Sequence, residues 1–214
     1  MSATGTALAQ PVRGYRYSAD SLLLADFAAR GRARACLDLG TGSGIVALRL
    51  LEAGACAMAV GVERQPELAA CALDNAAALS LADRFRIVLG DLRRVVRAAA
   101  PGGVDLVVAN PPFHRAGRKS PTTGRAAARH EGDTTLDDFV AAARQALGRR
   151  GRFCVVLPAA RLSDLTALVR KAGLEPKRIR FVHATADAPA RLVLCEAVAG
   201  KPGGMVVEPP VVER

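Results

Sequence analysis

The sequence predicts an α/β fold, with a mostly parallel sheet of seven strands that is covered by helices on both faces and ends in an antiparallel hairpin. Short apolar runs alternate with longer amphipathic segments, which is the pattern of strands alternating with helices. The apolar runs are continuous, as is typical of parallel strands buried on both faces. Only the loop 184–190 separates the last two runs, so we expect these two strands to form the hairpin.

Each expected element has a local signal in the sequence. Strands are expected at 35–39, 58–63, 85–89, 105–109, 153–157, 178–183 and 192–198. Helices are expected at 19–30, 44–53, 66–80, 92–99, 136–148 and 162–172. Ser18 is a favourable N-cap for the first helix, Pro66 suits a first helical turn, and Gly54 and Gly173 follow the ends of two helices.

The positive charge of the chain is concentrated in two segments. Residues 1–14 are expected to form an N-terminal tail and 15–214 a single domain with a basic loop at about 113–133, where no periodic pattern is found. That loop contains five cations and no acid between residues 113 and 130: Arg115, Arg118, Lys119, Arg125 and Arg129. Residues 144–180 add ten Lys or Arg against two acids. Such patches suit a polyanion, although a solvated surface fits the charge equally well.

Composition places the chain among ordinary globular proteins. It has 214 residues, of which 50% are hydrophobic and 23% charged, with a net charge of +10. Its five cysteines are scattered singly, which favours reduced thiols in the cytoplasm over disulfides or a zinc site. No apolar run reaches the length of about 20 residues that a membrane span needs. The three histidines lie far apart without a cysteine partner, so we expect no metal.

Three signals for a nucleotide ligand follow the first three expected strands. The glycine turn 40–44 presents free N–H groups at a helix start, although it also fits a dinucleotide-binding turn or a tight turn without a ligand. Glu63 closes the second strand, where an acid can accept hydrogen bonds from ribose hydroxyls. Asp91 follows the third strand, where it can accept from an adenine amino group or serve as a helix N-cap.

The signal after the fourth expected strand separates the remaining classes. Asn110-Pro111-Pro112-Phe113 directly follows the buried run 105–109. Two prolines fix the backbone and remove two N–H donors, which leaves carbonyl acceptors beside the Asn side chain. Together these acceptors can hold both hydrogens of a planar amine, and Phe113 offers a face for stacking. A nicotinamide-dependent dehydrogenase has no use for such a clamp, so we exclude that class.

These motifs resemble those of a known enzyme group. The turn that begins at Asp38, together with Glu63, Asp91 and the segment 110–113, resembles the ordered motifs of class I methyltransferases that methylate amines. The flanking segments 15–24, 128–131 and 175–183 resemble those of the tRNA(Val) adenine-N6-methyltransferase family. The resemblance covers almost the whole chain. It implies a Rossmann-like class I methyltransferase fold, S-adenosylmethionine as cofactor, and RNA as partner, with tRNA favoured.

The resemblance also implies roles for individual residues. Those expected to bind S-adenosylmethionine are Asp20, Asp38, Gly40, Thr41, Gly42, Glu63, Asp91 and Asn110. Asn110, Pro111 and Pro112 are expected to hold the target amine, and Phe113, where Tyr is usual in the family, to stack on the base. The cations of the basic loop and its His130 are expected to contact RNA phosphates.

Three other functions fit part of the pattern. Asn-Pro-Pro-Phe-His resembles enzymes that methylate guanine N2 in ribosomal RNA, which leaves the identity of the base open. N5-methylation of a protein glutamine uses the same clamp, but the cationic loop argues against a protein substrate. A non-catalytic RNA-binding module is disfavoured because both the clamp and the glycine turn are intact. We therefore expect a cytoplasmic RNA N-methyltransferase that acts on adenine N6.

Overall fold

The computed structural model describes residues 19–112, 134–200 and 202–213, and it confirms the expected α/β fold. Its strands are β1 Ala33–Leu39, β2 Cys56–Glu63, β3 Phe85–Leu89, β4 Val104–Ala109, β5 Leu147–Pro158, β6 Glu175–His183, β7 Ala190–Val198, β8 Val206–Val207 and β9 Val211–Val212. Its α-helices are α1 Ala19–Ala28, α2 Ile45–Glu52, α3 Pro66–Ala78, α4 Leu92–Ala99, α5 Leu136–Ala146 and α6 Leu162–Lys171.

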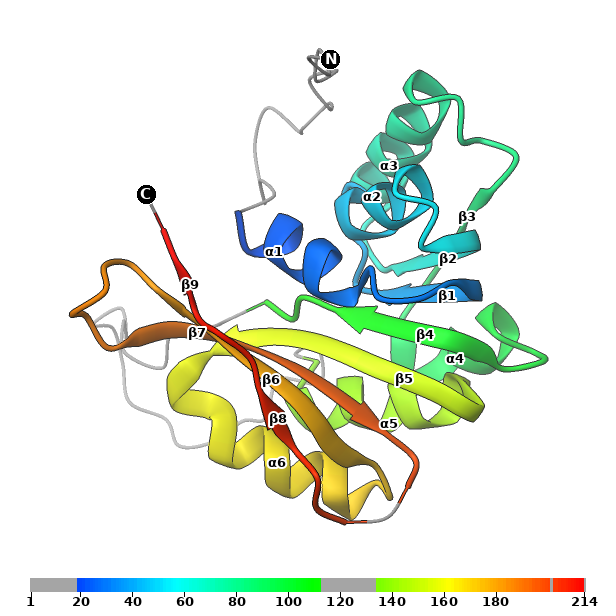
Figure 1. Cartoon of the computed structure of the whole chain (residues 1–214). Coiled ribbons are helices and arrows are strands. Elements are labelled where there is room, and N and C mark those ends of the chain that lie inside the picture. Colours follow the sequence, from blue (N-terminus) through cyan, green and yellow to red (C-terminus); the bar gives the residue numbers. More distant parts are fainter. Residues whose placement is uncertain (1–18, 113–133, 201, 214) are drawn as a thin grey trace, which may run out of the picture.

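All of these strands belong to one sheet, in the order β3-β2-β1-β4-β5-β7-β6-β8 (Figure 1). Strands β1 to β5 are parallel, whereas β7 is antiparallel to both of its neighbours, β5 and β6. The β6–β7 pair is the expected terminal hairpin. The chain builds outward from β1 to β3, then returns to the other side of β1 with β4. The neighbouring strands β1 and β4 therefore form the switch point of the sheet, where α/β proteins bind ligands.

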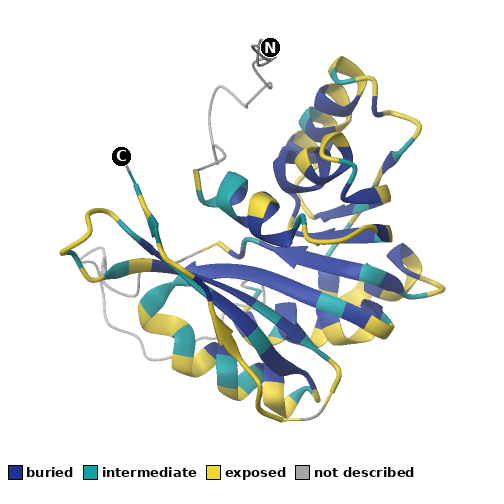
Figure 2. Cartoon of the chain, viewed as in Figure 1, coloured by how far each residue is buried: buried dark blue, intermediate teal, exposed yellow. Residues whose placement is uncertain are grey.

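The helices form two layers, one on each face of the sheet (Figure 1). Helices α1, α2 and α3 cover one face and pack with Leu24, Leu48 and Phe85 in one apolar core. Helices α4, α5 and α6 cover the other face around Phe139 and Phe153 in a second core. The central strands are buried between these layers, while the outer faces of the helices are exposed (Figure 2). Burial on both faces explains why the strand sequences read as continuous apolar runs.

Strand β5 begins earlier than the sequence indicates. The apolar pattern predicts a helix to residue 148 and a strand from 153, but α5 ends at Ala146 and β5 starts at Leu147. The start of β5 includes two exposed arginines, which gave no strand signal. A Cβ at Gly151 would lie 2.8 Å from the Val104 carbonyl oxygen, so this close approach of β5 to β4 needs glycine.

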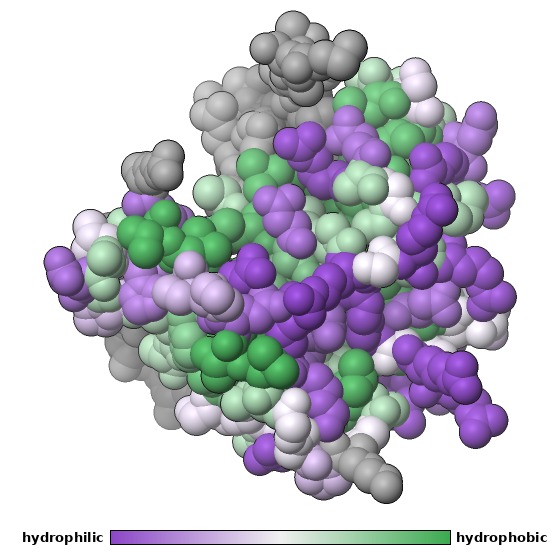
Figure 3. All heavy atoms as spheres, viewed as in Figure 1, coloured by the Kyte–Doolittle hydropathy of each residue, from purple (hydrophilic) through white to green (hydrophobic). Residues whose placement is uncertain are grey.

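Two short strands at the end of the described chain were not predicted. Strands β8 and β9 each have two residues and pair in parallel with β6. They are too short to show a period, and the two prolines between them interrupt the ladder. The apolar side chains of both strands reach the surface, with hydrophilic side chains between them (Figure 3).

A group of ion pairs joins this C-terminal segment to α1 and the hairpin. Arg178 on β6 is 4% exposed and donates to Glu196 at 2.8 Å and to the Phe27 carbonyl at 2.9 Å. It also pairs with Glu208, which follows β8, at 3.3 Å. Arg152 on β5 donates to the Ala28 carbonyl at 2.9 Å. The last carbonyls of α1, which lack partners within the helix, are thus bonded by arginines from two distant strands.

Candidate active site

The expected site residues gather at the edge of the sheet where β1 to β4 end. A cavity of about 250 Å³ opens there, with part of its wall contributed by α3 and α5. Six of the residues predicted from the sequence line it: Gly40, Gly42, Glu63, Asp91, Asn110 and Pro112. A smaller polar recess shares Gly40 and Asn110 with the cavity and contains Asp38 and Thr41. The cavity and recess therefore form one continuous site at the switch point.

The glycine turn connects β1 to α2 and has a backbone that only glycine adopts easily. Gly40, Gly42 and Gly44 all have positive φ angles, of 68°, 58° and 85°. Gly40 and Thr41 donate their N–H groups to the Val62 carbonyl at 2.9 and 3.0 Å, which ties the turn to the end of β2. The turn is therefore fixed by the backbone and lies against the cavity.

Asp38, near the end of β1, is the buried acid of the recess. Only 1% of its surface is exposed, and its Oδ2 accepts a hydrogen bond from the Thr41 hydroxyl at 2.7 Å. Burial raises the pKa of Asp38 to about 7, although the Thr41 bond acts in the opposite direction. The charge of nearby Glu63 raises this pKa further. The recess thus contains a carboxyl group that titrates near neutral pH.

Glu63, at the end of β2, connects the turn to the next strand. Its Oε2 accepts from the Gly42 N–H at 2.9 Å, and its Oε1 accepts from the N–H groups of Arg64 and Gln65 at 2.9 and 3.0 Å. A carboxylate has about four acceptor sites, so these three bonds leave capacity for a ligand hydroxyl. All three donors are neutral backbone groups, and Glu63 takes part in none of the ion pairs found among the described residues.

Asp91 follows β3, where it caps a helix beside the cavity. It is the N-cap of α4, where its side chain accepts from the Arg93 N–H at 2.9 Å, and it lines the cavity. The hydrogen bond from the Arg93 side chain holds the pKa of Asp91 below its usual value. A Cβ at the preceding Gly90 would lie 2.7 Å from Val95, so glycine is required for this close turn.

Asn110 follows β4, and its amide group is held by a residue from α1. Its Nδ2 donates to the hydroxyl of Ser21 at 3.0 Å, and Ser21 is 5% exposed and lines the recess. Because the amide is planar, this bond directs the carbonyl oxygen of Asn110 away from Ser21. Pro111 is buried, whereas Pro112 is exposed and lines the cavity. The orientation of the Asn side chain therefore depends on where α1 lies.

Other predicted residues lie outside this group. Asp20, expected near the cofactor, lines neither the cavity nor the recess, and it pairs with Arg191 of β7 at 3.1 Å. Its neighbour Ser21 takes the place at the site. Phe113 and the proposed RNA contacts lie outside the described residues: Arg115, Arg118, Lys119, Arg125, Arg129 and His130.

Sequence reasoning missed part of the wall. Phe139 of α5 and Leu68 of α3 line the cavity, and a Cβ at Gly40 would lie 3.5 Å from the Phe139 ring. In the sequence these residues read as the apolar faces of their helices, which gave no separate signal. Ser21 could have been found, because it lies within the N-terminal segment that resembles the methyltransferase family.

Two findings concern only the described residues. They contain no group of three or more His, Cys, Asp or Glu that could hold a metal ion. They also contain no helix that is both long enough and apolar enough to cross a membrane.

An open sheet with its cavity at the switch point is shared by several classes of nucleotide-binding enzyme. An Asn-Pro-Pro segment at the end of the fourth strand fits only one of these classes, the methyltransferases that act on amines. The chain is a methyltransferase that uses S-adenosylmethionine. It belongs to the methyltransferase small domain family, whose model matches residues 18–170.

Two of its relatives show how far the similarity extends. The tRNA1(Val) (adenine(37)-N6)-methyltransferase of Porphyromonas gingivalis is 33% identical over 187 residues, which cover 85% of this chain and 73% of the relative. The corresponding enzyme of Parabacteroides distasonis is 30% identical and covers 84% of this chain and 75% of the relative. The similarity therefore runs through the site and beyond the matched domain.

Solved structures show the same fold at lower identity. A TehB-like S-adenosylmethionine-dependent methyltransferase of Corynebacterium glutamicum superposes with a TM-score of 0.55 at 20% identity, covering 85% of this chain and 88% of that one. TrmN of Thermus thermophilus superposes with a TM-score of 0.58 at 19% identity, covering 84% of this chain and 48% of that one. Both comparisons confirm the Rossmann-like methyltransferase fold.

Proposed function

We propose that the enzyme transfers a methyl group to N6 of adenine 37 in tRNA1(Val), as its relatives' names state for them. The observation that carries this proposal is the Asn110 amide, fixed by Ser21 at the edge of a cavity suited to a nucleoside. A tRNA substrate also supports a cytoplasmic location. The basic loop, with its five cations, is a further proposed contact for the tRNA backbone.

The residues of the cavity fit S-adenosylmethionine. Glu63 and Asp91 both line the cavity, and we assign Glu63 to the ribose hydroxyls and Asp91 to the adenine amino group. Val62, Leu68 and Leu92 provide apolar walls for the adenine ring. The recess with Asp38 and Thr41 adjoins the glycine turn and supplies polar groups for the methionine end.

The clamp positions the target amine for the transfer. S-adenosylmethionine supplies an electrophilic methyl group on a sulfonium, which is already a good leaving group. The carbonyl oxygens of Asn110 and Pro111 accept the two hydrogens of the amine, so that its nitrogen lone pair is directed at the methyl group. Phe113 offers its ring to the flipped base. Positioning of this kind supplies most of the rate, and we assign no general base.

Unmodified tRNA and the Asn110→Ala variant test this proposal together. The wild-type enzyme should produce N6-methyladenosine in tRNA, identified by mass spectrometry of the nucleosides. Asn110→Ala should lower turnover by about 100-fold or more, because the amide acts mainly at the transition state. Calorimetry should show S-adenosylmethionine binding to the variant at close to wild-type affinity. A variant that keeps full turnover would remove the clamp from the mechanism.

The alternative substrates give different products in the same experiment. N2-methylguanosine in ribosomal RNA would retain the clamp but overturn the adenine assignment. A methyl group on a protein glutamine, with none on RNA, would overturn the RNA proposal itself.

A further inference from the structure

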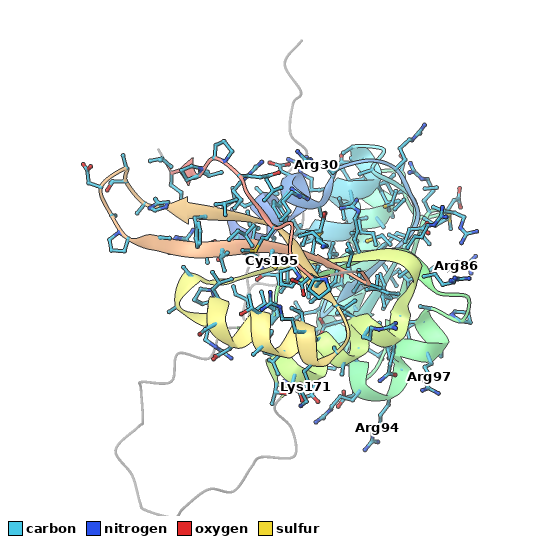
Figure 4. All side chains as sticks on the ribbon, turned by 60° about the horizontal axis from the view of Figure 1, so that its bottom comes forward. Arg30, Arg86, Arg94, Arg97, Lys171 and Cys195 are labelled. Atoms are coloured by element: carbon cyan, nitrogen blue, oxygen red, sulfur yellow. The ribbon has the colours of Figure 1, made fainter. Side chains whose placement is uncertain are left out.

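A cluster of arginines that form no ion pair with another described residue lies on the layer formed by α4 and α5. Arg94 and Arg97 on α4, Arg144 on α5 and Arg149 on β5 are all exposed. We call these four residues the α4–α5 arginine face. Figure 4 shows Arg94 and Arg97 extending from α4 away from the sheet. Between the ends of the two helices lies a hollow lined by Arg97, Arg144 and Arg149.

In the described structure the arginine face differs from most of the cations in the basic stretch 144–180. Arg161, Arg170 and Arg178 are engaged with acids at 3.1 Å or less. Arg152 and Arg180 are likewise paired, with Glu196 and Glu208. By contrast, no residue of the arginine face forms an ion pair within the described part of the chain. The basic stretch 144–180 therefore contributes to two surfaces. On one surface the arginines are paired with acids, and on the other they form no ion pair in the described structure.

The acid nearest to the arginine face along α4 is Asp91, which interacts with Arg94 but forms its ion pair with Arg93. Residues 92–103 and 139–151 contain six arginines and neither Asp nor Glu. Arg94 and Arg97 are three positions apart on one helix, where like charges repel and cost stability. The C-terminal ends of α4 and α5 also point toward the hollow. The partial negative charge of these two helix ends is much smaller than the positive charge of three guanidinium groups. The face remains strongly cationic.

The arginine face is continuous with the active site through the two helices. Helix α4 begins after Asp91, which lines the cavity, and α5 contributes Phe139 to the cavity wall. Both helices then run away from the site toward the hollow, α5 over a length of about 16 Å. The hollow lies where β4 begins and the cavity where β4 ends, so the backbone of a polyanion must extend along this layer to reach both.

We propose that the α4–α5 arginine face binds the phosphate backbone of the tRNA whose base occupies the cavity. This inference rests on the proposed function, and it adds a described surface to the basic loop. The contacts are to phosphates, so they are independent of sequence and contribute affinity and register rather than choice of base. Guanidinium groups suit this role because they donate to phosphate oxygens in a fork geometry.

Paired double variants test the arginine face in the full-length enzyme. Arg94→Ala/Arg97→Ala removes the α4 half of the face, and Arg144→Ala/Arg149→Ala removes the hollow. Arg32→Ala/Arg34→Ala is the matched control, because these two arginines are exposed, form no ion pair in the described structure, and lie at the start of β1 beside the end of α2. Affinity for unmodified tRNA is measured from about 50 to about 300 mM salt.

Each α4–α5 double variant should flatten the dependence of log affinity on log salt by about two units, or one per arginine removed. The KM for tRNA should rise, while kcat at saturating tRNA and the affinity for S-adenosylmethionine stay at wild-type values. The control variant should bind as the wild type does. If the α4–α5 variants bind tRNA like the control at every salt concentration, the proposal is wrong. If they lose tRNA binding but the wild type methylates no tRNA, the arginine face binds RNA as proposed, and the proposed methylation of tRNA is wrong.

Discussion

Buried and half-buried carboxylates occur in two regions of the sheet, and the two regions hold them differently. At the active site, Asp38 and Glu63 are bonded by a threonine hydroxyl and by backbone N–H groups, all of them neutral. At the hairpin, Glu196 and Glu208 are bonded by arginines. Both sets of acids are largely or completely inaccessible to water. The two regions differ in whether the hydrogen-bond donors to the acids are neutral groups or cationic side chains.

The pKa directions follow from these partners. Burial raises the pKa of Asp38 to about 7, because its hydroxyl partner offsets only part of the desolvation. Burial also raises the pKa of Glu196, but Arg178 and Arg152 outweigh it, and the net direction is downward. The hairpin acids are neutralised within the protein and serve the fold. In the described structure Asp38 and Glu63 form no ion pair, whereas Asp91 of the same cavity pairs with Arg93. Acids without an internal ion pair are the pattern expected of a binding site.

The largest expected effect of this difference is on stability at the hairpin. Glu196→Ala should lower the free energy of unfolding by about 3–5 kcal/mol, because it removes the acid partner of the buried Arg178 and the half-buried Arg152. Urea unfolding measures this loss. The folded variant should still bind S-adenosylmethionine as the wild type does. A loss below about 1 kcal/mol would show that the hairpin acids are as replaceable as surface pairs.

Asp38 should make stability depend on pH in the opposite sense to a salt-bridged acid. Its pKa is raised on folding, so the folded state keeps the proton between about pH 4 and 7 where the unfolded state loses it. Stability from this group is present below about pH 4 and is lost as the pH rises to 7, by up to about 4 kcal/mol. Asp38→Asn should remove that slope. We expect the difference between wild type and variant in urea midpoints to change between about pH 4 and 7, and a constant difference would refute the assignment.

The smallest expected effect concerns Glu63. Glu63→Gln keeps a side chain of the same size and one acceptor for the turn, but removes the unneutralised charge. S-adenosylmethionine should bind more weakly by about 1–3 kcal/mol, measured by calorimetry. Glu175→Gln at the hairpin is the matched control, since that acid pairs with Arg170 and lies outside the cavity. Equal cofactor affinity in all three proteins would exclude Glu63 from the site.

Much of the fold was predictable because strands buried on both faces of the sheet have continuous apolar sequences. The seven strands from 35–39 to 192–198 and their hairpin are confirmed, since continuous apolar runs and helical periods are local signals. The early start of β5 and the short strands β8 and β9 were not predictable. Their residues are held in the sheet by pairing with distant strands, and no local pattern records that pairing.

The candidate site was predictable where its residues directly follow strands. Glu63, Asp91 and Asn110 were found from their positions, because the carboxyl ends of parallel strands share one edge of the sheet. Phe139 was missed because packing of α5 on the sheet already explains an apolar residue at this position. The bond from Asn110 to Ser21 joins residues 89 positions apart, and only the folded chain brings them together.

The arginine bonds at the end of α1 also connect the clamp to the last strands of the chain. Ser21 reaches Asn110 only if α1 is docked, and the last carbonyls of α1 are bonded by Arg152 and Arg178, over 120 residues later. Arg178 in turn needs Glu196 from the next strand. A chain emerging from the ribosome has its glycine turn, Glu63 and Asn-Pro-Pro segment long before it has these contacts. The full set of contacts that holds α1, and with it Ser21, therefore requires the last strands of the chain.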